Sequence, residues 1–294
     1  MNDKSLPPTY SPVQEDGLTP VQKAQQRKFL QARGITPGKP FQLSLWGDDK
    51  RMQPNDTVRS ALFTARQTKV PREFIKRQQV FSPDPTIKIV YTGEELRAGS
   101  DEIIWMQLLQ YARDLPIGEM RTFNINQLCV DIGWATKAAN DAYYEIVYES
   151  IERLASGMIK VVSERHGKAA YMPMIVLHRS DEQINKNPTK FMYSIHPDLI
   201  LLVAGKTVTH LEWAPMKTLN PTQQRLYGYI ASHRDPLPLK VVDFHKMCSS
   251  LNQNMGSFRQ EIKKALDKFV KEGLIIRGWI ADGEIHFERP NRKQ

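Results

Sequence analysis

Residues 253–271 place apolar side chains and hydrogen-bonding or basic side chains on opposite sides of one predicted helix. At about 100° per residue, the apolar face consists of Phe258, Ile262, Ala265, Leu266, Phe269 and Val270. The opposite face consists of Gln253, Ser257, Gln260, Lys264, Lys268 and Lys271, with Arg259 and Lys263 flanking it. Glutamine can pair with adenine, serine with several base edges, and lysine with guanine or phosphate. The pattern predicts a DNA-contacting helix, and the alternative is an ordinary solvated basic face.

The elements that would position this helix occur twice along the chain. Residues 123–159 and residues 239–276 each read as a short helix, a turn, a long helix and the start of a β-hairpin. A long helix that follows a short one can enter the major groove of DNA. The repeat therefore predicts an α+β fold with two tandem winged-helix domains, each a helix-turn-helix with a β-hairpin wing.

The first winged-helix domain is expected over residues 100–215. Ser100 has the chemistry of a helix N-cap, with acidic residues in the first turn that follows. Apolar spacing then predicts helices over 103–112, 123–132 and 136–156, hairpin strands over 158–165 and 169–177, a strand over 191–195 and a short helix over 197–204.

The exposed face of the first long helix is acidic. Asp141, Glu145 and Glu149 recur on it, and carboxylates repel phosphate, so only the first turns are expected near DNA. The candidate contacts are Lys137, Asp141 and Tyr144 on this helix and Arg165 and Lys168 at the tip of the hairpin. Asp141 can accept a hydrogen bond from a cytosine amine. A charged surface turn is the alternative for the hairpin tip.

The second winged-helix domain is expected over residues 216–294. Asn220-Pro221-Thr222 opens its first helix, with proline at the first helical position. A short helix over 241–248 and the long helix over 252–272 follow. Strands over 275–280 and 284–288 flank Ala281-Asp282-Gly283, in which Asp-Gly is a strong signal for a hairpin turn.

The region before residue 100 contains a short peptide with a different character. Residues 1–40 hold six of the 19 prolines and read as a disordered basic arm, with a short helix over 21–33. Residues 41–99 lead into the first domain and include a strand over 87–91. Within them, Gln42-Leu43-Ser44-Leu45-Trp46 can insert its apolar side chains into a preformed groove on a partner. The alternative is a short strand packed on this chain's own first domain.

Composition restricts the class of protein. The 294 residues carry 41 Lys and Arg against 32 Asp and Glu, a net charge of +9 that favours a polyanionic partner. The two cysteines are expected as buried free thiols in a reducing cytosol. No apolar run approaches the ~20 residues of a membrane span, and the N-terminus is unlike a signal peptide.

No motif typical of an enzyme is complete in this sequence. Gly205-Lys206-Thr207 resembles the end of a phosphate loop, but Ile200 occupies the position of the required earlier glycine. The seven histidines are scattered without the His-x-His pair of a DNA-nicking initiator, and the two cysteines are weak evidence for a metal site. We expect no enzymatic activity, metal or cofactor.

Five segments carry a resemblance to a known family. They are Leu45-Trp46-Gly47-Asp48-Asp49, Pro54-Asn55-Asp56 with Arg59-Ser60-Ala61-Leu62-Phe63-Thr64, Pro71-Arg72-Glu73, Tyr91-Thr92-Gly93 with Glu95-Leu96-Arg97, and Ser232-His233-Arg234-Asp235-Pro236 with Pro238-Leu239-Lys240. From about residue 41 to residue 288 the chain resembles the TrfA family of plasmid replication initiators. The long helix of the first module departs from the family pattern.

The resemblance implies a function in the cytoplasm of a bacterial host. It implies binding to directly repeated origin sites (iterons) and opening of an adjacent AT-rich element. The single strands of the opened element are then a further partner. The resemblance also implies recruitment of the replicative helicase. It also implies that Gln42–Trp46 is a sliding-clamp motif, with Trp46 where the family more often has Phe. Inactive dimers in equilibrium with DNA-binding monomers are implied as well. The competing interpretation is a transcriptional repressor with the same modules.

Overall fold

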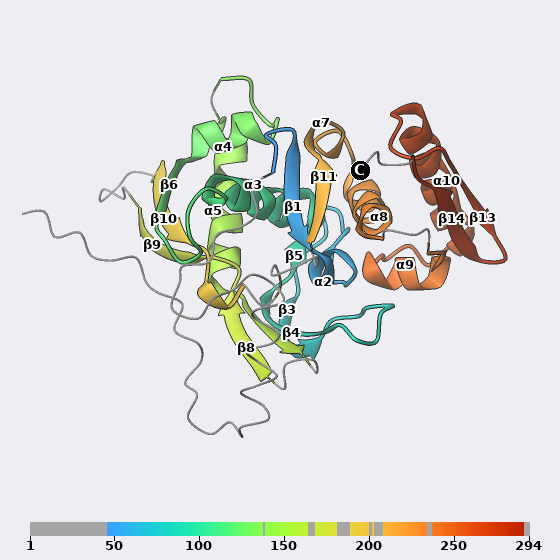
Figure 1. The fold of residues 1–294 in the computed structure, drawn as a ribbon, viewed down its shortest axis with the longest axis horizontal. Helices are drawn as coiled ribbons and strands as arrows, with labels where there is room; N and C mark the ends of the chain where they lie inside the picture. The colour runs from blue at the N-terminus through green and yellow to red at the C-terminus, as the bar shows by residue number, and fades with distance from the viewer. Residues whose placement is uncertain are drawn as a thin grey trace, which may run out of the picture.

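The computed structural model describes residues 46–137, 139–163, 168–180, 189–199, 202, 208–233 and 237–290. The arm over 1–40, the helix over 21–33, Gln42 to Leu45, Arg165 and the phosphate-loop-like segment at 205–207 lie outside the described residues. Helices and strands are mixed throughout the described residues (Figure 1). The α+β class predicted from the sequence is therefore confirmed.

The segment before residue 100 supplies strands to sheets that later parts of the chain complete. Strand β1 (Lys50–Pro54) pairs antiparallel with β11 (Val208–Glu212). Strands β3 (Phe74–Gln79) and β4 (Lys88–Glu94) continue into a four-stranded sheet of order β3-β4-β7-β8. The strand predicted over 87–91 is confirmed as β4. The remaining short elements here are α2 (Asn55–Val58), β2 (Phe63–Thr64) and β5 (Leu96–Arg97).

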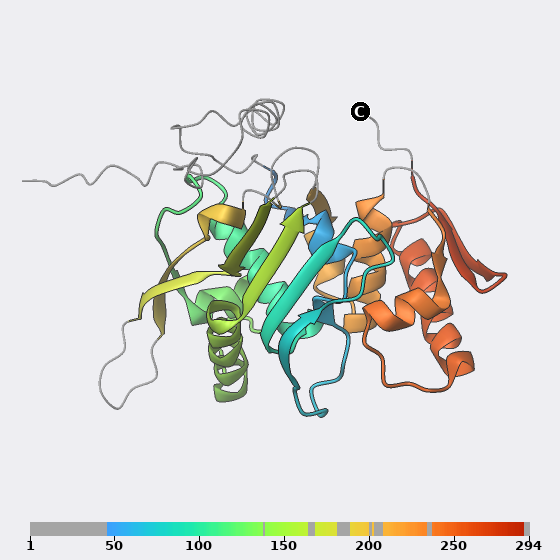
Figure 2. The same ribbon diagram turned by 90° about the horizontal axis from the view of Figure 1, so that it is seen from below.

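The expected hairpin after the first long helix forms, but it is not a free wing. Strands β7 (Met158–Ser163) and β8 (Lys168–Pro173) pair with each other, and β7 also pairs with β4 along five residues. The four strands lie side by side in Figure 2, in cyan and yellow-green. The hairpin predicted over 158–165 and 169–177 is therefore present as β7 and β8, and β4 hydrogen-bonds to the other edge of β7 and makes the hairpin part of a larger sheet.

The buried helix predicted over 103–112 is confirmed as α3 (Ile103–Ala112). The N-cap expected at Ser100 is wrong, because a π-helical turn, η1 (Ala98–Glu102), already precedes α3. Asp101 and Glu102, expected to complement a helix end, are buried and bound to arginines instead: Arg153 Nε lies 3.0 Å from Asp101 Oδ1.

The next elements surround α3. Strand β6 (Arg121–Asn124) leads into α4 (Ile125–Asp131), and α5 (Asp141–Ser156) follows. Helix α5 begins later than the predicted position 136, because Asn140 caps it by accepting from the Tyr143 amide at 2.9 Å. Strands β9 (Val176–Ser180) and β10 (Lys190–Ser194) form a sheet of order β6-β10-β9. Two short helices, η3 (Pro197–Leu199) and α7 (Trp213–Met216), complete this part.

The last part of the chain contains the predicted helices and hairpin in the predicted order and adds a short strand, β12, that was not predicted. It comprises α8 (Pro221–Ser232), β12 (Leu239–Lys240), α9 (Val241–Met247), α10 (Met255–Lys271), β13 (Arg277–Ala281) and β14 (Glu284–Glu288). The three strands form one sheet of order β12-β14-β13. Asn220 and Gln223 make a capping box at the start of α8. Asp282 and Gly283 have φ angles of 51° and 77°, as a two-residue hairpin turn requires.

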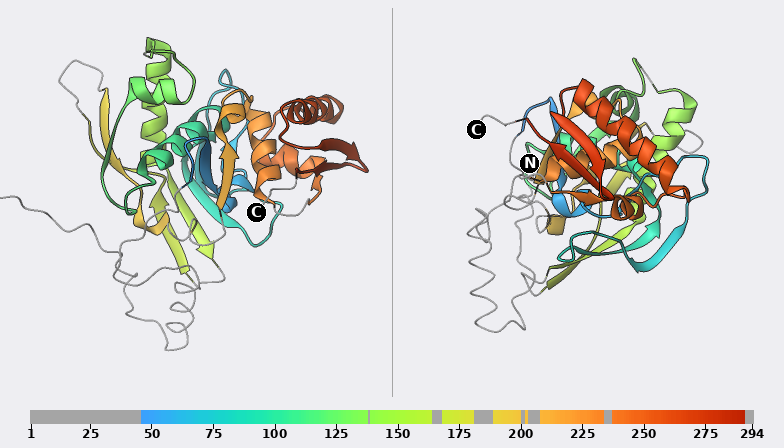
Figure 3. Two further views of the ribbon diagram at one scale, coloured as in Figure 1. Left: turned by 45° about the horizontal axis from the view of Figure 1, so that its top comes forward. Right: turned by 90° about the vertical axis from the view of Figure 1, so that its right-hand side faces the viewer.

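Helix α8 joins this last part to the rest of the molecule. Its Arg225 is 1% exposed, and the guanidinium lies 2.5 Å from Glu102 Oε1. The same guanidinium donates to the carbonyl oxygens of Val58 at 2.8 Å and Ser60 at 2.5 Å. In the views of Figures 1 and 3, α8 lies between α10 and the strands of the first part. One continuous apolar core runs from Met52 to Phe287.

Candidate nucleic-acid interface

Helices α9 and α10 are held at a defined angle by the turn between them. Asn254 caps α10 by accepting from the Ser257 amide at 3.0 Å. His245 Nε2 on α9 hydrogen-bonds to the carbonyl oxygen of Asn252 at 2.8 Å. Phe258 packs against the rings of Phe244 and His245, with centroid distances of 5.8 and 4.9 Å. These contacts bury the inner face of α10 and leave its outer face to solvent.

The predicted faces of α10 are confirmed except at Gln253, Lys268 and Val270. The buried residues are Phe258, Ile262, Ala265, Leu266 and Phe269. Val270, expected on the apolar face, is 42% exposed, because its position turns it toward solvent beyond the edge of the core. Gln253, predicted on this helix, precedes its cap Asn254 and lies exposed in the turn before α10. The exposed predicted contacts on the outer face are Ser257, Arg259, Gln260, Lys263, Lys264 and Lys271. The end of the molecule that carries α10 faces the viewer in the right panel of Figure 3.

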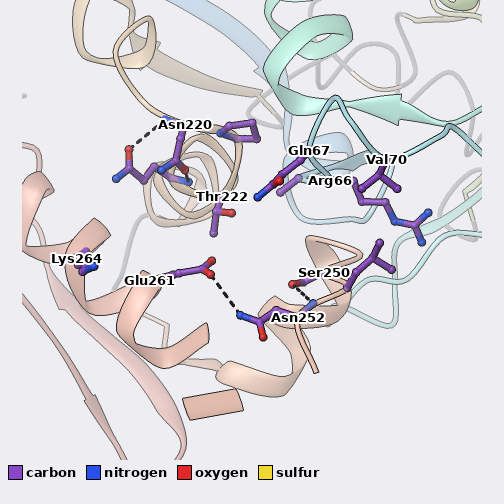
Figure 4. Close-up of a pocket in the computed structure, with 13 residues that line it drawn as sticks. Arg66, Gln67, Val70, Asn220, Thr222, Ser250, Asn252, Glu261 and Lys264 are labelled. Atoms are coloured by element: carbon purple, nitrogen blue, oxygen red, sulfur yellow. Dashed lines mark hydrogen bonds between the residues drawn. The ribbon is translucent and has the colours of Figure 1, made fainter. Parts of the chain in front are cut away.

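Three of the residues on α10 that are predicted to contact DNA also contact or face other parts of this chain. Lys268 is half-buried, and its ammonium donates to the Thr218 carbonyl oxygen at 2.8 Å. Ser257 accepts from the Asn252 side chain at 3.2 Å. Lys264 lines an open cleft of ≈ 560 Å³ together with Glu261, the start of α8 and residues 65–70 (Figure 4). Arg259, Gln260, Lys263 and Lys271 remain as the exposed predicted contacts of α10 whose side chains bond to no other described residue.

The hairpin next to α10 carries an aromatic stack that the sequence analysis missed. Trp279 on β13 is 38% exposed and stacks on His286 of β14 at 5.3 Å and 8°. The Arg277 guanidinium lies 4.7 Å from the Trp279 ring, within the range of a cation–π contact. The alternation of Arg277 and Trp279 on one side of a strand was the available signal. Trp279 and His286 lie on the side of the hairpin opposite Gly278, which packs on Leu266 of α10. This side presents a cation and an indole to solvent.

Helix α5 has the opposite charge. Its exposed charged side chains are Asp141, Glu145, Glu149 and Glu152. Arg153, its one basic residue, is buried and paired with Asp101. Such a surface repels phosphate, whereas α10 exposes mainly cations.

The predicted contacts of the first module are spread over separate places. Lys137 lies exposed in the loop before α5, and Asp141 is exposed in its first turn. Tyr144 is half-buried and stacks on Tyr148 at 6.1 Å. Lys168 begins β8, where its partner is Ser163, and Arg165 lies outside the described residues. These residues form no continuous basic surface within the described part of the chain.

Of the peptide Gln42–Trp46, the structure describes only Trp46. Its indole N–H donates to Gln110 Oε1 at 2.5 Å, and its ring lies 5.8 Å from that of His210. Trp46 is half-buried and packs on the core of the first part. For this residue the structure matches the alternative, packing on the chain's own first domain, while Gln42 to Leu45 lie outside the described residues.

The cysteines are inert thiols, as expected. Cys129 and Cys248 are both buried and unpaired. Burial raises the pKa of Cys129 to about 11 and that of Cys248 to about 12, so neither forms thiolate at neutral pH. Among the described residues, no three His, Cys, Asp or Glu side chains converge on a point that could hold a metal ion. None of the described helices is long and apolar enough to cross a bilayer.

Comparison with proteins of known sequence identifies relatives. The family model described as TrfA protein matches residues 22–289. The plasmid replication initiator protein TrfA of Escherichia coli is 35% identical over 249 residues, which cover 85% of this chain and 64% of that protein. The chain thus spans just under two thirds of the length of this relative.

Comparison with solved structures gives a similar fold at low identity. The crystal structure of RctB domains 2–3 matches with a TM-score of 0.51 and 10% identity, covering 80% of this chain and 96% of the other. A selenomethionine form of the same two RctB domains matches with a TM-score of 0.50 and 9% identity, covering 81% and 98%. At these identities the likeness concerns the fold alone. The match over residues 22–289 and the 35% identity show that the chain belongs to the TrfA family.

Proposed function

We propose that this protein is a plasmid replication initiator that binds origin DNA. The family membership and the name of the Escherichia coli relative support the initiator role. The net charge of +9 supports a polyanionic partner. The protein then acts in the cytoplasm of the bacterial host, through binding and without a catalytic step.

The observation that carries DNA binding is the exposed basic face of α10. Helix α8, strand β12, helices α9 and α10 and the hairpin β13–β14 follow one another in the order of a winged helix. In that arrangement α10 enters the major groove, with Ser257, Arg259, Gln260, Lys263 and Lys264 toward the bases and phosphates. The Trp279–His286 stack on the hairpin, with Arg277 over the indole, adds a further contact to the DNA backbone.

The charge of α5 supports unequal roles for the two modules. We propose that the first module approaches DNA through Lys137, the first turn of α5 and the hairpin tip with Arg165 and Lys168, since the later turns of α5 repel phosphate. Iterons are then read mainly by α10, with the first module adding contacts on a neighbouring groove, about 10.5 base pairs away.

The later steps of initiation complete the proposal. Bending or untwisting of the bound repeats favours opening of an adjacent AT-rich element, because deformed DNA stores elastic energy. The exposed single strands, the host helicase and the sliding clamp are the further partners, the clamp through Gln42–Trp46. A dimer in equilibrium with the DNA-binding monomer regulates how much protein is active.

A footprint of the purified protein on the DNA flanking its own gene tests the proposal. A ladder of protected direct repeats beside an AT-rich stretch is the expected result. One protected inverted repeat over a promoter would identify a transcriptional repressor instead. Absence of protection at moderate salt would remove the DNA-binding assignment of α10 altogether.

A further inference from the structure

Trp46 has two roles that exclude each other. It is the last residue of the peptide Gln42–Trp46, which under the proposed function inserts into a groove of the sliding clamp. In the structure the same indole is docked on this protein, with its N–H 2.5 Å from Gln110 Oε1 and its ring 5.8 Å from His210. One side chain cannot occupy both sites at once.

The docking site is built from the last turn of α3. Gln110 is 7% exposed, and its amide is used at both ends: the oxygen accepts from Trp46, and the nitrogen donates to Asp48 Oδ1 at 3.2 Å. Arg113 binds the same Asp48 oxygen at 2.5 Å. Arg51 donates to the Asp48 carbonyl at 2.8 Å. The chain is thus held against α3 immediately after the peptide.

Release of Trp46 leaves the neighbouring strand pair intact. The β1–β11 register begins only at Lys50, opposite Glu212. The Trp213 amide donates to the Asp49 carbonyl oxygen at 2.8 Å, so the chain from Asp49 onward stays in place. Undocking of Trp46 therefore breaks its hydrogen bond to Gln110 and its ring contact with His210, while Asp48 stays bound to Arg113 and Arg51.

We propose that the Gln110–His210 site competes with the sliding clamp for Trp46 and holds the clamp-binding peptide inactive in the free protein. This inference rests on the proposed clamp binding. The apparent affinity for the clamp equals the intrinsic affinity of the peptide multiplied by the fraction of molecules with Trp46 undocked. Any change that weakens docking tightens clamp binding, although the change lies outside the peptide.

The test measures clamp affinity by calorimetry for the full chain and for a synthetic peptide of residues 41–47, which has no docking site. Gln110→Ala removes the acceptor for the indole and should tighten binding of the full chain about fivefold, the equivalent of one hydrogen bond. Gln127→Ala is the matched control, since this exposed glutamine on α4 bonds only to Asp131 among the contacts described. It should leave the affinity unchanged.

A second variant keeps the test valid if Gln110→Ala does not fold. Trp46→Phe keeps an aromatic anchor but lacks the N–H that docks on Gln110, so the change should favour clamp binding more in the full chain than in the peptide. Equal affinities of peptide and wild-type chain, with no gain from either variant, would overturn the inference and leave clamp binding intact. Failure of the peptide itself to bind the clamp would overturn the clamp assignment, and the inference with it.

Discussion

Arg225 connects residues that are far apart in the sequence. Its side chain is 1% exposed and that of Glu102 is 2% exposed, with 2.5 Å between them. The guanidinium also donates to backbone carbonyls of α2 and the residues after it. A buried charge is tolerated only when its partner is present, because desolvation costs several kcal/mol per ion.

Arg225→Ala should lower the free energy of unfolding by about 3–5 kcal/mol, since Glu102 is left charged in the interior. Arg277→Ala is the control, because its pair with Glu288 is exposed at 65% and 41%, and its loss should cost less than about 1 kcal/mol. Urea denaturation followed by circular dichroism measures both. Similar small losses for the two variants would contradict a structural role of the buried pair.

His233 makes stability depend on pH. Its Nδ1 lies 2.9 Å from the Tyr229 carbonyl oxygen, and the ring packs on Tyr229 at 4.4 Å. Burial lowers the pKa of His233 below its ordinary value of 6.5, and the hydrogen bond to Tyr229 opposes this only in part. The folded protein therefore takes up a proton less readily at this site than the unfolded chain does.

In the unfolded chain the pKa of His233 is its ordinary value of 6.5. The contribution of neutral His233 to stability should therefore be complete above pH 6.5 and should be lost as the pH falls below it. His233→Gln removes the titrating group, so the urea midpoint of the variant should change less between about pH 7.5 and about pH 5.5 than that of the wild type. A parallel decrease in both proteins would assign the pH dependence to other groups.

At the scale of elements, the two long helices differ in charge although the sequence places them in equivalent positions. Helix α10 exposes Arg259, Lys263, Lys264 and Lys271, whereas α5 exposes four carboxylates. Since phosphate contacts supply much of the affinity for DNA, the difference predicts that substitutions on α10 affect binding more than substitutions on α5.

Lys263→Ala should weaken binding to the direct repeats. It should also make the slope of the logarithm of the binding constant against the logarithm of the salt concentration less steep by about 0.9, the value for one phosphate contact. Lys268→Ala is the matched control on the same helix, because its ammonium is already bound to Thr218 and close to Glu272 at 3.7 Å. Fluorescence anisotropy at several salt concentrations measures both variants. A larger effect from Lys268 than from Lys263 would place the DNA on the other side of α10.

At the scale of the whole molecule, the parts before and after Thr218 share one interior. Helix α8 brings Arg225 into the first part, and the apolar core is continuous from Met52 to Phe287. The turn between α9 and α10 is tied back as well: the Ala65 amide donates to the Cys248 carbonyl at 2.8 Å, and Arg66 Nε to that of Ser249 at 3.1 Å. The two parts are therefore expected to unfold together.

The wild-type chain should show one unfolding transition in urea, with coincident midpoints by tryptophan fluorescence and far-ultraviolet circular dichroism. Arg225→Ala should shift both midpoints together to lower urea concentration, because it removes a contact that stabilises both parts. Two resolved transitions in the wild type would mean that the shared interior does not couple them.

Elements that depend on neighbouring residues could be predicted from the order of the amino acids. Periodicity of period 3.6 identified α3, α10 and the inner face of α10, and Asn220 and Asp282-Gly283 marked a helix start and a hairpin turn. These signals are local, since caps, turns and amphipathic faces involve residues only a few positions apart. The exposed α10 residues proposed to contact DNA were found by the same means.

Contacts between distant segments could not be predicted in the same way and are seen in the folded protein. Strand β4 pairs with β7, β1 pairs with β11, and Trp46 lies against Gln110, although no local pattern connects these residues. The acids at 101 and 102 looked like first-turn residues of a helix and became buried partners of Arg153 and Arg225. Strand pairing and buried ion pairs depend on how the whole chain minimises exposed apolar surface and unpaired charge. Because this is a property of the complete fold, residues at a fixed spacing in the sequence do not indicate it.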